Sequence, residues 1–236
     1  MQFNARKCNI MCISNTKSPV TIKLYEIDNT VLSHVDSATY LGILLHKSLK
    51  FNEHINETAN KCNRKLGFLK RNLRGSPTRL KETAYLSLVR SSAEYGGAIW
   101  DPHTLTSIDK LERVQRRAAR WVCGYGPREE VSVSSLLNQL KWPPLSRRRK
   151  DQRLTLLFKI VNGEVGITPE DLGLVPGYRG TRSNHRFKFR EPPGRTQETK
   201  NSCLNTTIRD WNLLPPTLAE ADSLSTFKSR LAAQLD

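Results

Sequence analysis

Apolar residues recur at helical spacing after residue 53, and this spacing most limits how the chain can fold. The residues that repeat at intervals of three or four are Ile55, Ala59, Cys62, Leu66, Leu69 and Leu73. At about 100° of rotation per residue they share one stripe of a helix, while the neighbouring basic residues lie away from it. A lone helix cannot bury such a stripe, so the segment needs other elements to pack against.

Two more amphipathic helices are predicted downstream. Ser76 and Pro77 provide a cap and a proline at the first helical position, followed by an apolar face of Leu80, Ala84 and Leu88, with Tyr85 as a further candidate. Gly96-Gly97 and Asp101-Pro102 interrupt the chain before the third helix. Three amphipathic helices with short connections favour a small bundle.

The third helix, Ile108 to Val122, has one apolar face and one arginine face. The apolar face comprises Ile108, Leu111, Val114, Ala118, Trp121 and Val122, and the other face Arg113, Arg116, Arg117 and Arg120. Arginines at this spacing line up over roughly 10 Å and repel one another unless an anion lies in front of them. This geometry suits contact with a phosphate backbone, although most charged helix faces are simply solvated.

The net charge of +16 supports the phosphate interpretation because the excess is confined to the middle of the chain. Residues 61–125 carry 14 basic and 5 acidic residues, and residues 126–200 carry 15 and 8. The two flanks are close to neutral. Such asymmetry attracts polyanions, of which nucleic acid is the commonest.

The first fifty residues are predicted to form strands. Cys8 to Ile13 is an apolar run, Val20 to Tyr25 alternates, Asp28-Asn29 offers a turn, and Tyr40 to Leu45 is a strand broken by Gly42. Few residues are available to pack against this small predicted sheet, so we expect it to be the edge of a larger sheet. An unsupported edge of this kind tends to aggregate.

The remainder is predicted to be mostly helical, with a loop rich in Gly, Pro, Arg and Asn at residues 163–202. A short helix and then a longer one are predicted after residue 132, and the longer one begins with the four basic residues Arg147 to Lys150. Four consecutive charges wrap around a helix, so they are weaker evidence for nucleic-acid binding than the arginine face of the third helix. In Arg186 to Arg190 two phenylalanines alternate with cations, which suits either base stacking or a core strand. Ser223 is expected to cap the second helix of a terminal pair.

No convincing catalytic or metal site is visible. Asp28, Asp36 and Asp101 sit in turn-like surroundings, Glu129 and Glu130 are adjacent in an extended segment, and the five histidines are isolated. The five cysteines fit neither a disulfide framework nor a zinc site, and buried thiols are expected at Cys62 and Cys123. Because no apolar run is long enough to span a bilayer and no secretory segment is seen, we expect an intracellular protein, nuclear or cytoplasmic, without membrane contact.

A series of short sequence landmarks runs along the whole chain. These landmarks are Phe3-Asn4, Lys7-Cys8, Tyr40-Leu41-Gly42-Ile43, Leu49, His54-Ile55, Leu66-Gly67-Phe68-Leu69-Lys70-Arg71, Ala84-Tyr85, Leu88-Val89-Arg90, Glu94-Tyr95, Trp100-Asp101-Pro102, Val114-Gln115-Arg116-Arg117-Ala118-Ala119-Arg120, Leu140-x-Trp142, Leu145-x-x-Arg148-Arg149, Trp211-Asn212-x-Leu214-Pro215 and Phe227-Lys228. These landmarks resemble the C-terminal part of reverse transcriptases from LINE-type (non-LTR) retrotransposons, in the jockey-like branch, and their order along the chain makes the signal specific.

The resemblance implies an α+β fold, predominantly α. Residues 1–50 would be the last strands of the polymerase palm, a small antiparallel sheet with a primer-grip-like hairpin at Tyr40, Leu41 and Gly42. Residues 51–125 would be a three-helix thumb-like bundle, and 126–236 a mostly helical C-terminal extension. The family's Tyr-x-Asp-Asp metal site falls before Met1, so no cofactor is expected here, and Mg²⁺ only in a complete polymerase.

The expected partners are RNA and DNA, as an RNA–DNA hybrid or template–primer duplex, together with the missing palm and fingers. The residues predicted to contact nucleic acid are Arg113, Arg116, Arg117, Arg120, Lys61, Arg64, Lys65, Lys70, Arg71, Arg147, Arg148, Arg149, Arg186, Lys188 and Arg190. Two alternatives stay open: a truncated version of a complete, active reverse transcriptase, and a host-adopted helical module that binds acidic proteins.

Overall fold

The computed structural model describes residues 4–14, 23–126, 129–177, 185–194 and 196–234. Contacts divide the chain into two compact units, Met1–Glu57 and Thr58–Asp236. Phe3, the first half of the strand expected at Val20 to Tyr25, and residues 178–184 of the expected basic loop lie outside the described residues. The division into palm-like, thumb-like and extension parts stays a prediction.

The first unit holds short strands. Its elements are η1 (Ala5–Lys7), β1 (Asn9–Ile10), β2 (Glu26–Ile27), β3 (Thr30–Val31), β4 (Ser33–His34), β5 (Ser37–Tyr40) and β6 (Ile43–His46). In the described residues the strands form three separate two-stranded sheets, and β1 pairs with β4 in parallel. The expected single antiparallel sheet is therefore wrong in detail, although β2–β3 and β5–β6 are antiparallel.

Two tight turns join the antiparallel pairs. Asp28 and Asn29 have φ of 48° and 58° between β2 and β3, which confirms the predicted turn. Leu41 and Gly42 have φ of 47° and 79° and connect β5 to β6. Two successive residues with positive φ form the hairpin turn that matches the twist of antiparallel strands. The chain therefore reverses direction at Leu41 and Gly42, which confirms the break predicted at Gly42 and the hairpin that the resemblance implies at Tyr40 to Gly42.

The predicted first helix is confirmed as α1 (Asn52–Asn72), which begins in the first unit and continues in the second. Its apolar stripe from Ile55 to Leu69 is buried, and Leu73 just beyond it is half-buried. In the first unit, the backbone N–H of Leu44 in β6 donates to Nδ1 of His54 at 3.2 Å. This bond ties the start of the helix to the hairpin.

The second predicted helix is present, but a different face of it is buried. It consists of α2 (Thr78–Ala84), the π-helical η2 (Tyr85–Arg90) and α3 (Ser91–Glu94), and α4 (Gly97–Trp100) follows. Leu80 and Leu88 are 49% and 47% exposed, so the predicted face is wrong. Tyr85, Val89 and Ala93 are buried instead.

Tyr85 decides which face turns inward. Its ring stacks on Trp142 with centroids 4.4 Å apart, and its hydroxyl donates to Oε1 of Gln115 at 3.2 Å. An aromatic side chain buries more area than a leucine, and its polar tip has a partner here. The series at Tyr85, Val89 and Ala93 therefore takes the inner position.

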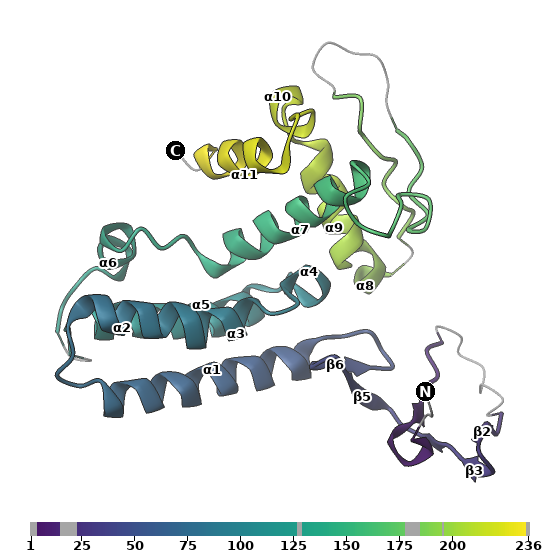
Figure 1. Cartoon of the computed structure of the whole chain (residues 1–236), viewed down its shortest axis with the longest axis horizontal. Helices are drawn as coiled ribbons and strands as arrows, with labels where there is room; N and C mark the ends of the chain where they lie inside the picture. Colours follow the sequence, from purple (N-terminus) through teal and green to yellow (C-terminus); the bar gives the residue numbers. More distant parts are fainter. Residues whose placement is uncertain (1–3, 15–22, 127–128, 178–184, 195, 235–236) are drawn as a thin grey trace. The chain divides into compact units, whose positions relative to one another are not determined.

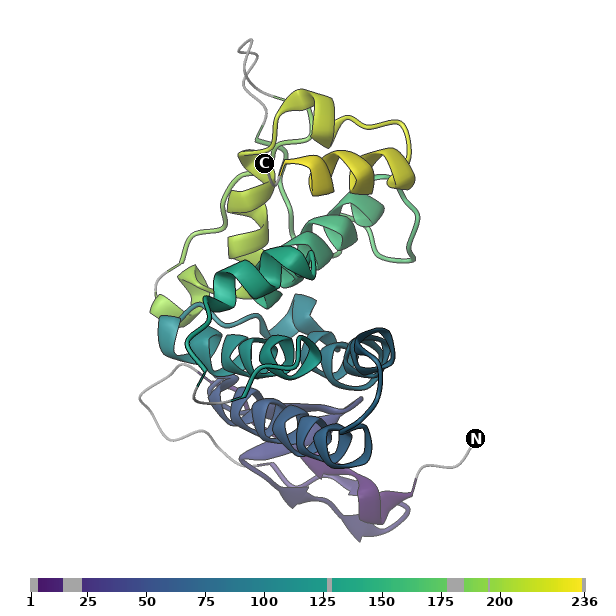
Figure 2. The ribbon, with the colours of Figure 1, turned by 90° about the vertical axis from the view of Figure 1, so that its left-hand side faces the viewer.

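The remaining helices build the rest of the second unit (Figure 1). They are α5 (Leu105–Val122), α6 (Val133–Gln139), α7 (Leu145–Val161), α8 (Gln197–Lys200), α9 (Cys203–Asn212), α10 (Pro216–Ala219) and α11 (Leu224–Ala233). Within this unit α7 lies between the earlier helices and the C-terminal ones, as Figure 2 shows, and it contacts α3, α4, α5, α9 and α11. None of the described helices is both long and apolar enough to cross a membrane.

The C-terminal core confirms the predicted pair of terminal helices. Phe158 of α7 stacks on Phe227 of α11 at 4.4 Å, and Trp211 of α9 is buried beside them. The Ser223 side chain accepts from the backbone N–H of Thr226, as expected of a cap. Phe189 is buried in this core and Phe187 packs against it, so the core alternative is confirmed for the phenylalanines.

Substitution of neighbouring residues in η2 tests which face is buried. Val89→Ala should lower the free energy of unfolding by about 2 kcal/mol because it removes fully buried methyl groups. Leu88→Ala should change it by less than about 0.5 kcal/mol, since that side chain is half exposed. Urea denaturation measures both. A larger loss at Leu88 than at Val89 would show that the originally predicted face is buried.

Candidate nucleic-acid interface

Helix α5 carries the two faces that its sequence predicts. Leu111, Val114 and Ala118 are buried against the rest of the unit. On the opposite side, the side chain of Arg113 is 67% exposed and that of Arg116 is 40% exposed. Burial of the apolar side therefore holds the arginine side at the surface.

Asp109 begins the arginine face, and it changes the electrostatics of that face. Its Oδ2 lies 2.6 Å from Nε of Arg113, and its Oδ1 pairs with Arg116. The hydrogen bond from Arg116, with help from the charge of Arg113, holds the pKa of the Asp109 carboxyl below its ordinary value. For two of the four arginines, the anion that relieves their mutual repulsion is therefore a carboxylate of the same helix.

The other two arginines of α5 have polar partners without charge. Arg117 Nη2 donates to Oδ1 of Asn63 in α1 at 2.9 Å, so its side chain reaches from one helix to the other. Arg120 donates to the backbone carbonyls of Gly126 and Glu129 in the loop that follows the helix. Arg117 keeps its positive charge at an exposed position, whereas Arg120 holds a loop.

The five predicted residues of α1 lie on different sides of that helix. Lys61 and Arg64 are exposed and form no ion pair among the described residues. Lys65 is turned toward η2 and α3, where its ammonium donates to the Leu88 carbonyl at 3.1 Å and to Ser92 Oγ at 2.6 Å.

Lys70 and Arg71 lie near the side of α1 that meets α5. Burial and the nearby charge of Arg117 lower the pKa of Lys70. Nη1 of Arg71 lies 3.6 Å from the position a Cβ would take at Gly67. Arg64 lies on the same side of α1 as Arg71. With Lys70 and arginines of α5 they form a basic surface that we call the α1–α5 face: Arg64, Lys70, Arg71, Arg113, Arg116 and Arg117.

The basic cluster at the start of α7 forms internal ion pairs. Arg147 pairs with Asp151 at 2.9 Å and also donates to the Leu231 carbonyl. Arg148 pairs with Glu94 of α3, and Lys150 pairs with Asp210 of α9 at 2.8 Å. These side chains connect α7 to elements on both sides of it.

Arg149 is completely buried. Its Nε donates to Oδ1 of Asp101 at 2.6 Å, and its guanidinium lies 5.8 Å from the centre of the Trp100 ring. A Cβ at Gly97 would lie 3.0 Å from its side chain, so the glycine allows this close approach. Arg149 has no surface to offer a ligand, and we leave it out of the candidate interface.

The sequence pattern does not single out Arg153, the second buried arginine of α7. It donates to Oδ2 of Asp101 at 3.0 Å, to Oδ2 of Asp210 at 3.2 Å and to Thr207 Oγ1 at 3.1 Å. Asp101, expected to be a turn or cap residue, thus receives two arginines. One sequence signal could have indicated that Arg153 is buried. Arg149 and Arg153 are one helical turn apart, and Arg153 precedes the buried Leu154.

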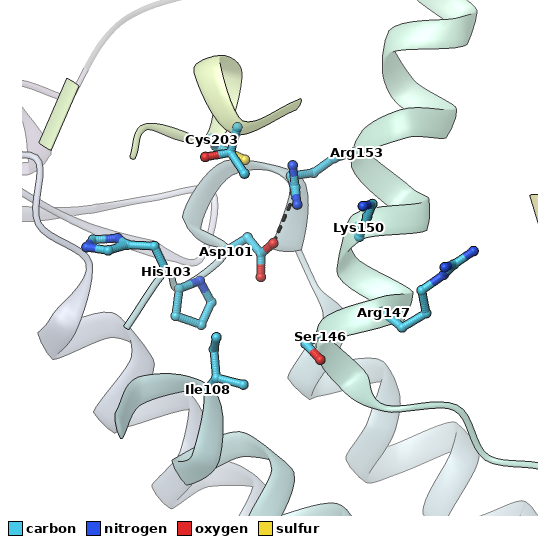
Figure 3. Close-up of a pocket in the computed structure, with 10 residues that line it drawn as sticks. Asp101, His103, Ile108, Ser146, Arg147, Lys150, Arg153 and Cys203 are labelled. Carbon is cyan, nitrogen blue, oxygen red and sulfur yellow. Dashed lines mark hydrogen bonds and ion pairs between the residues drawn. The ribbon is translucent and has the colours of Figure 1, made fainter. Parts of the chain in front are cut away.

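A pocket of about 310 Å³ opens beside this ionic cluster (Figure 3). It is lined by Asp101, Pro102, His103, Ile108, Ser146, Arg147, Lys150, Arg153, Cys203 and Thr206. Its basic residues are all paired with carboxylates, and burial raises the pKa of the Cys203 thiol to about 11. The pocket therefore offers neither uncompensated positive charge nor a reactive thiolate at neutral pH.

The remaining predicted residues lie apart from the α1–α5 face in the chain. Arg186 places its guanidinium 4.7 Å from the centre of the Phe187 ring, Lys188 is half-buried and Arg190 is exposed. The side chains of Tyr40 and Leu41 are exposed at the β5–β6 turn of the first unit. Within the described residues, no group of three or more His, Cys, Asp or Glu side chains could hold a metal ion.

Sequence comparison identifies a relative. Over 131 residues, or 53% of this chain, the sequence is 30% identical to the "Probable RNA-directed DNA polymerase from transposon BS" of Drosophila melanogaster. About half of this chain is therefore similar to part of a transposon RNA-directed DNA polymerase. The matched region is 14% of that protein's length. No protein-family model and no solved structure matches the chain.

This relative confirms the resemblance to transposon reverse transcriptases inferred from the sequence landmarks. Glu94, Asp101, Arg148 and Arg149, which belong to three of those landmarks, are joined as ion pairs. At these positions the reverse-transcriptase pattern coincides with contacts that hold the helices of the second unit together.

A pair of arginine substitutions tests the division between internal and surface arginines. Arg149→Ala should lower the free energy of unfolding by about 3 kcal/mol, because it leaves the carboxylate of Asp101 with only one of its two guanidiniums. Arg113→Ala should change it by less than about 0.5 kcal/mol. Urea denaturation of both variants measures the difference. Equal small losses would show that Arg149 is accessible to solvent.

Proposed function

We propose that this chain is the part of a LINE-type transposon RNA-directed DNA polymerase that holds the template–primer duplex. The observation that carries the proposal is the α1–α5 face, where exposed cations of two helices adjoin one another. A rigid helical surface of this kind neutralises phosphates and positions a duplex without reading its sequence. Polymerisation itself would belong to a complete protein, of which this chain would be one part.

The parts implied by the resemblance extend this proposal. Residues 51–125 would act as the thumb-like element, with the primer-grip-like hairpin at Tyr40 to Gly42 before it and the C-terminal extension after it. Recognition of an RNA–DNA hybrid would depend mainly on its shape and backbone. Arg186 and Arg190 would offer a secondary contact, because they are exposed and basic.

Salt dependence of binding tests the proposal. The logarithm of the association constant should fall linearly with the logarithm of salt concentration, by about 0.9 for each phosphate contact. Replacement of Arg71, Arg113, Arg116 and Arg117 by Gln should reduce that slope by about 2 or more. Fluorescence anisotropy with a 20-base-pair RNA–DNA hybrid between 50 and 200 mM salt measures it.

The matched control removes four charges elsewhere. Lys159, Arg209, Lys228 and Arg230, on α7, α9 and α11, are replaced by Gln, and this variant should keep most of the wild-type slope. If the two variants lose the same slope, binding depends on net charge alone and the α1–α5 face has no special role. Several hybrids of unrelated sequence should bind equally well.

A further inference from the structure

The junction between α1 and α5 brings cations from the two helices together. Arg117 of α5 donates to Oδ1 of Asn63 in α1 at 2.9 Å. Two turns further along α1, the ammonium of Lys70 is half-buried and close enough to Arg117 for the two charges to repel. Two like charges are therefore held near one another by the packing of the helices.

Gly67 leaves a gap in the side-chain layer of α1 at this junction. A Cβ built at Gly67 would have one neighbour within 4 Å outside the helix backbone, the Nη1 atom of Arg71 at 3.6 Å. No packed side chain or facing helix therefore accounts for the glycine. Glycine inside a helix is less favourable than alanine by about 1 kcal/mol, so this position gives up helix stability and gains open space above the backbone.

The cations around the gap lack acidic partners. In the part of the chain that the structure describes, Lys70, Arg71 and Arg117 form no ion pair. By contrast, Arg113 and Arg116 share Asp109, and each basic residue from 147 to 150 has a carboxylate. The positive charges of Lys70, Arg71 and Arg117 are therefore not compensated by a carboxylate among the described residues.

We propose that the gap above Gly67 binds one backbone phosphate of a nucleic-acid duplex, an inference that rests on the proposed function. The residues that form this seam site are Asn63, Gly67, Lys70, Arg71 and Arg117. The guanidiniums provide planar pairs of N–H donors that match phosphate oxygens, and Lys70 adds a point charge. Without a Cβ at Gly67, a phosphate oxygen can approach between these donors.

Two double variants separate the seam site from other basic residues of α1. Lys70→Gln with Arg117→Gln removes two uncompensated charges, and it should weaken binding of the 20-base-pair hybrid by about tenfold or more at low salt. Lys61→Gln with Arg64→Gln removes the same number of charges from α1, and neither residue belongs to the seam site. That control should weaken binding by about threefold or less.

A third variant fills the gap without changing any charge. Gly67→Leu should leave the urea midpoint unchanged or raise it, because leucine favours a helix more than glycine does. It should nevertheless weaken binding severalfold by blocking the phosphate. Gly75→Leu is its control, since a Cβ at Gly75 meets nothing within 4 Å, and it should bind as the wild type does.

The outcomes distinguish the inference from the proposed function. If the wild-type chain does not bind the hybrid at all, the proposed function is wrong and the inference falls with it. If the wild type binds, but Gly67→Leu binds equally tightly and the Lys70/Arg117 variant loses no more than its control, the seam site is wrong and the proposed function stands. Weakened binding by a stably folded Gly67→Leu supports the inference, because a purely structural role cannot produce it.

Discussion

The second unit depends on a buried ionic cluster at its centre. Asp101 receives Arg149 and Arg153 from α7, and Arg153 also binds Asp210 of α9. Buried charges are costly unless each one is paired and hydrogen-bonded, so the segments that carry them must come together in one arrangement. Through these contacts α7 is fixed to the residues that follow α4 on one side and to α9 on the other.

This cluster divides the basic residues of the chain into two classes. Arg147 to Lys150 and Arg153 of α7 are neutralised by Glu94, Asp101, Asp151 and Asp210, and these pairs hold the unit together. The cations of the α1–α5 face are mostly exposed, and within the described part of the chain Arg113 and Arg116 are the members of that face that pair with a carboxylate. The net charge of +16 already subtracts these carboxylates, so it represents cations without an acidic partner, and the α1–α5 face carries part of that excess.

Periodicity predicts α1 and α5 well because each helix buries one wide apolar stripe, which depends only on local spacing. It fails where a partner distant in sequence decides the outcome, as Trp142 does when it selects Tyr85 over Leu88. Arg149 is a second failure of this kind, because only the fold brings Asp101 to it. The ion pair of Asp109 with Arg113, in contrast, could have been predicted, because the two residues are four positions apart in a helix. The pair is missed when only the cations of that face are considered.

The central claim is that the arginines of α7 are internal and those of the α1–α5 face are available to a duplex. Modification of arginines by a dicarbonyl reagent, mapped by mass spectrometry with and without the RNA–DNA hybrid, tests both halves together. We expect Arg149 and Arg153 to stay unmodified in either state, and Arg64, Arg71 and Arg117 to react freely until the hybrid protects them. Modification of Arg149 in the folded free protein, or no protection of Arg117 by bound hybrid, would contradict the account.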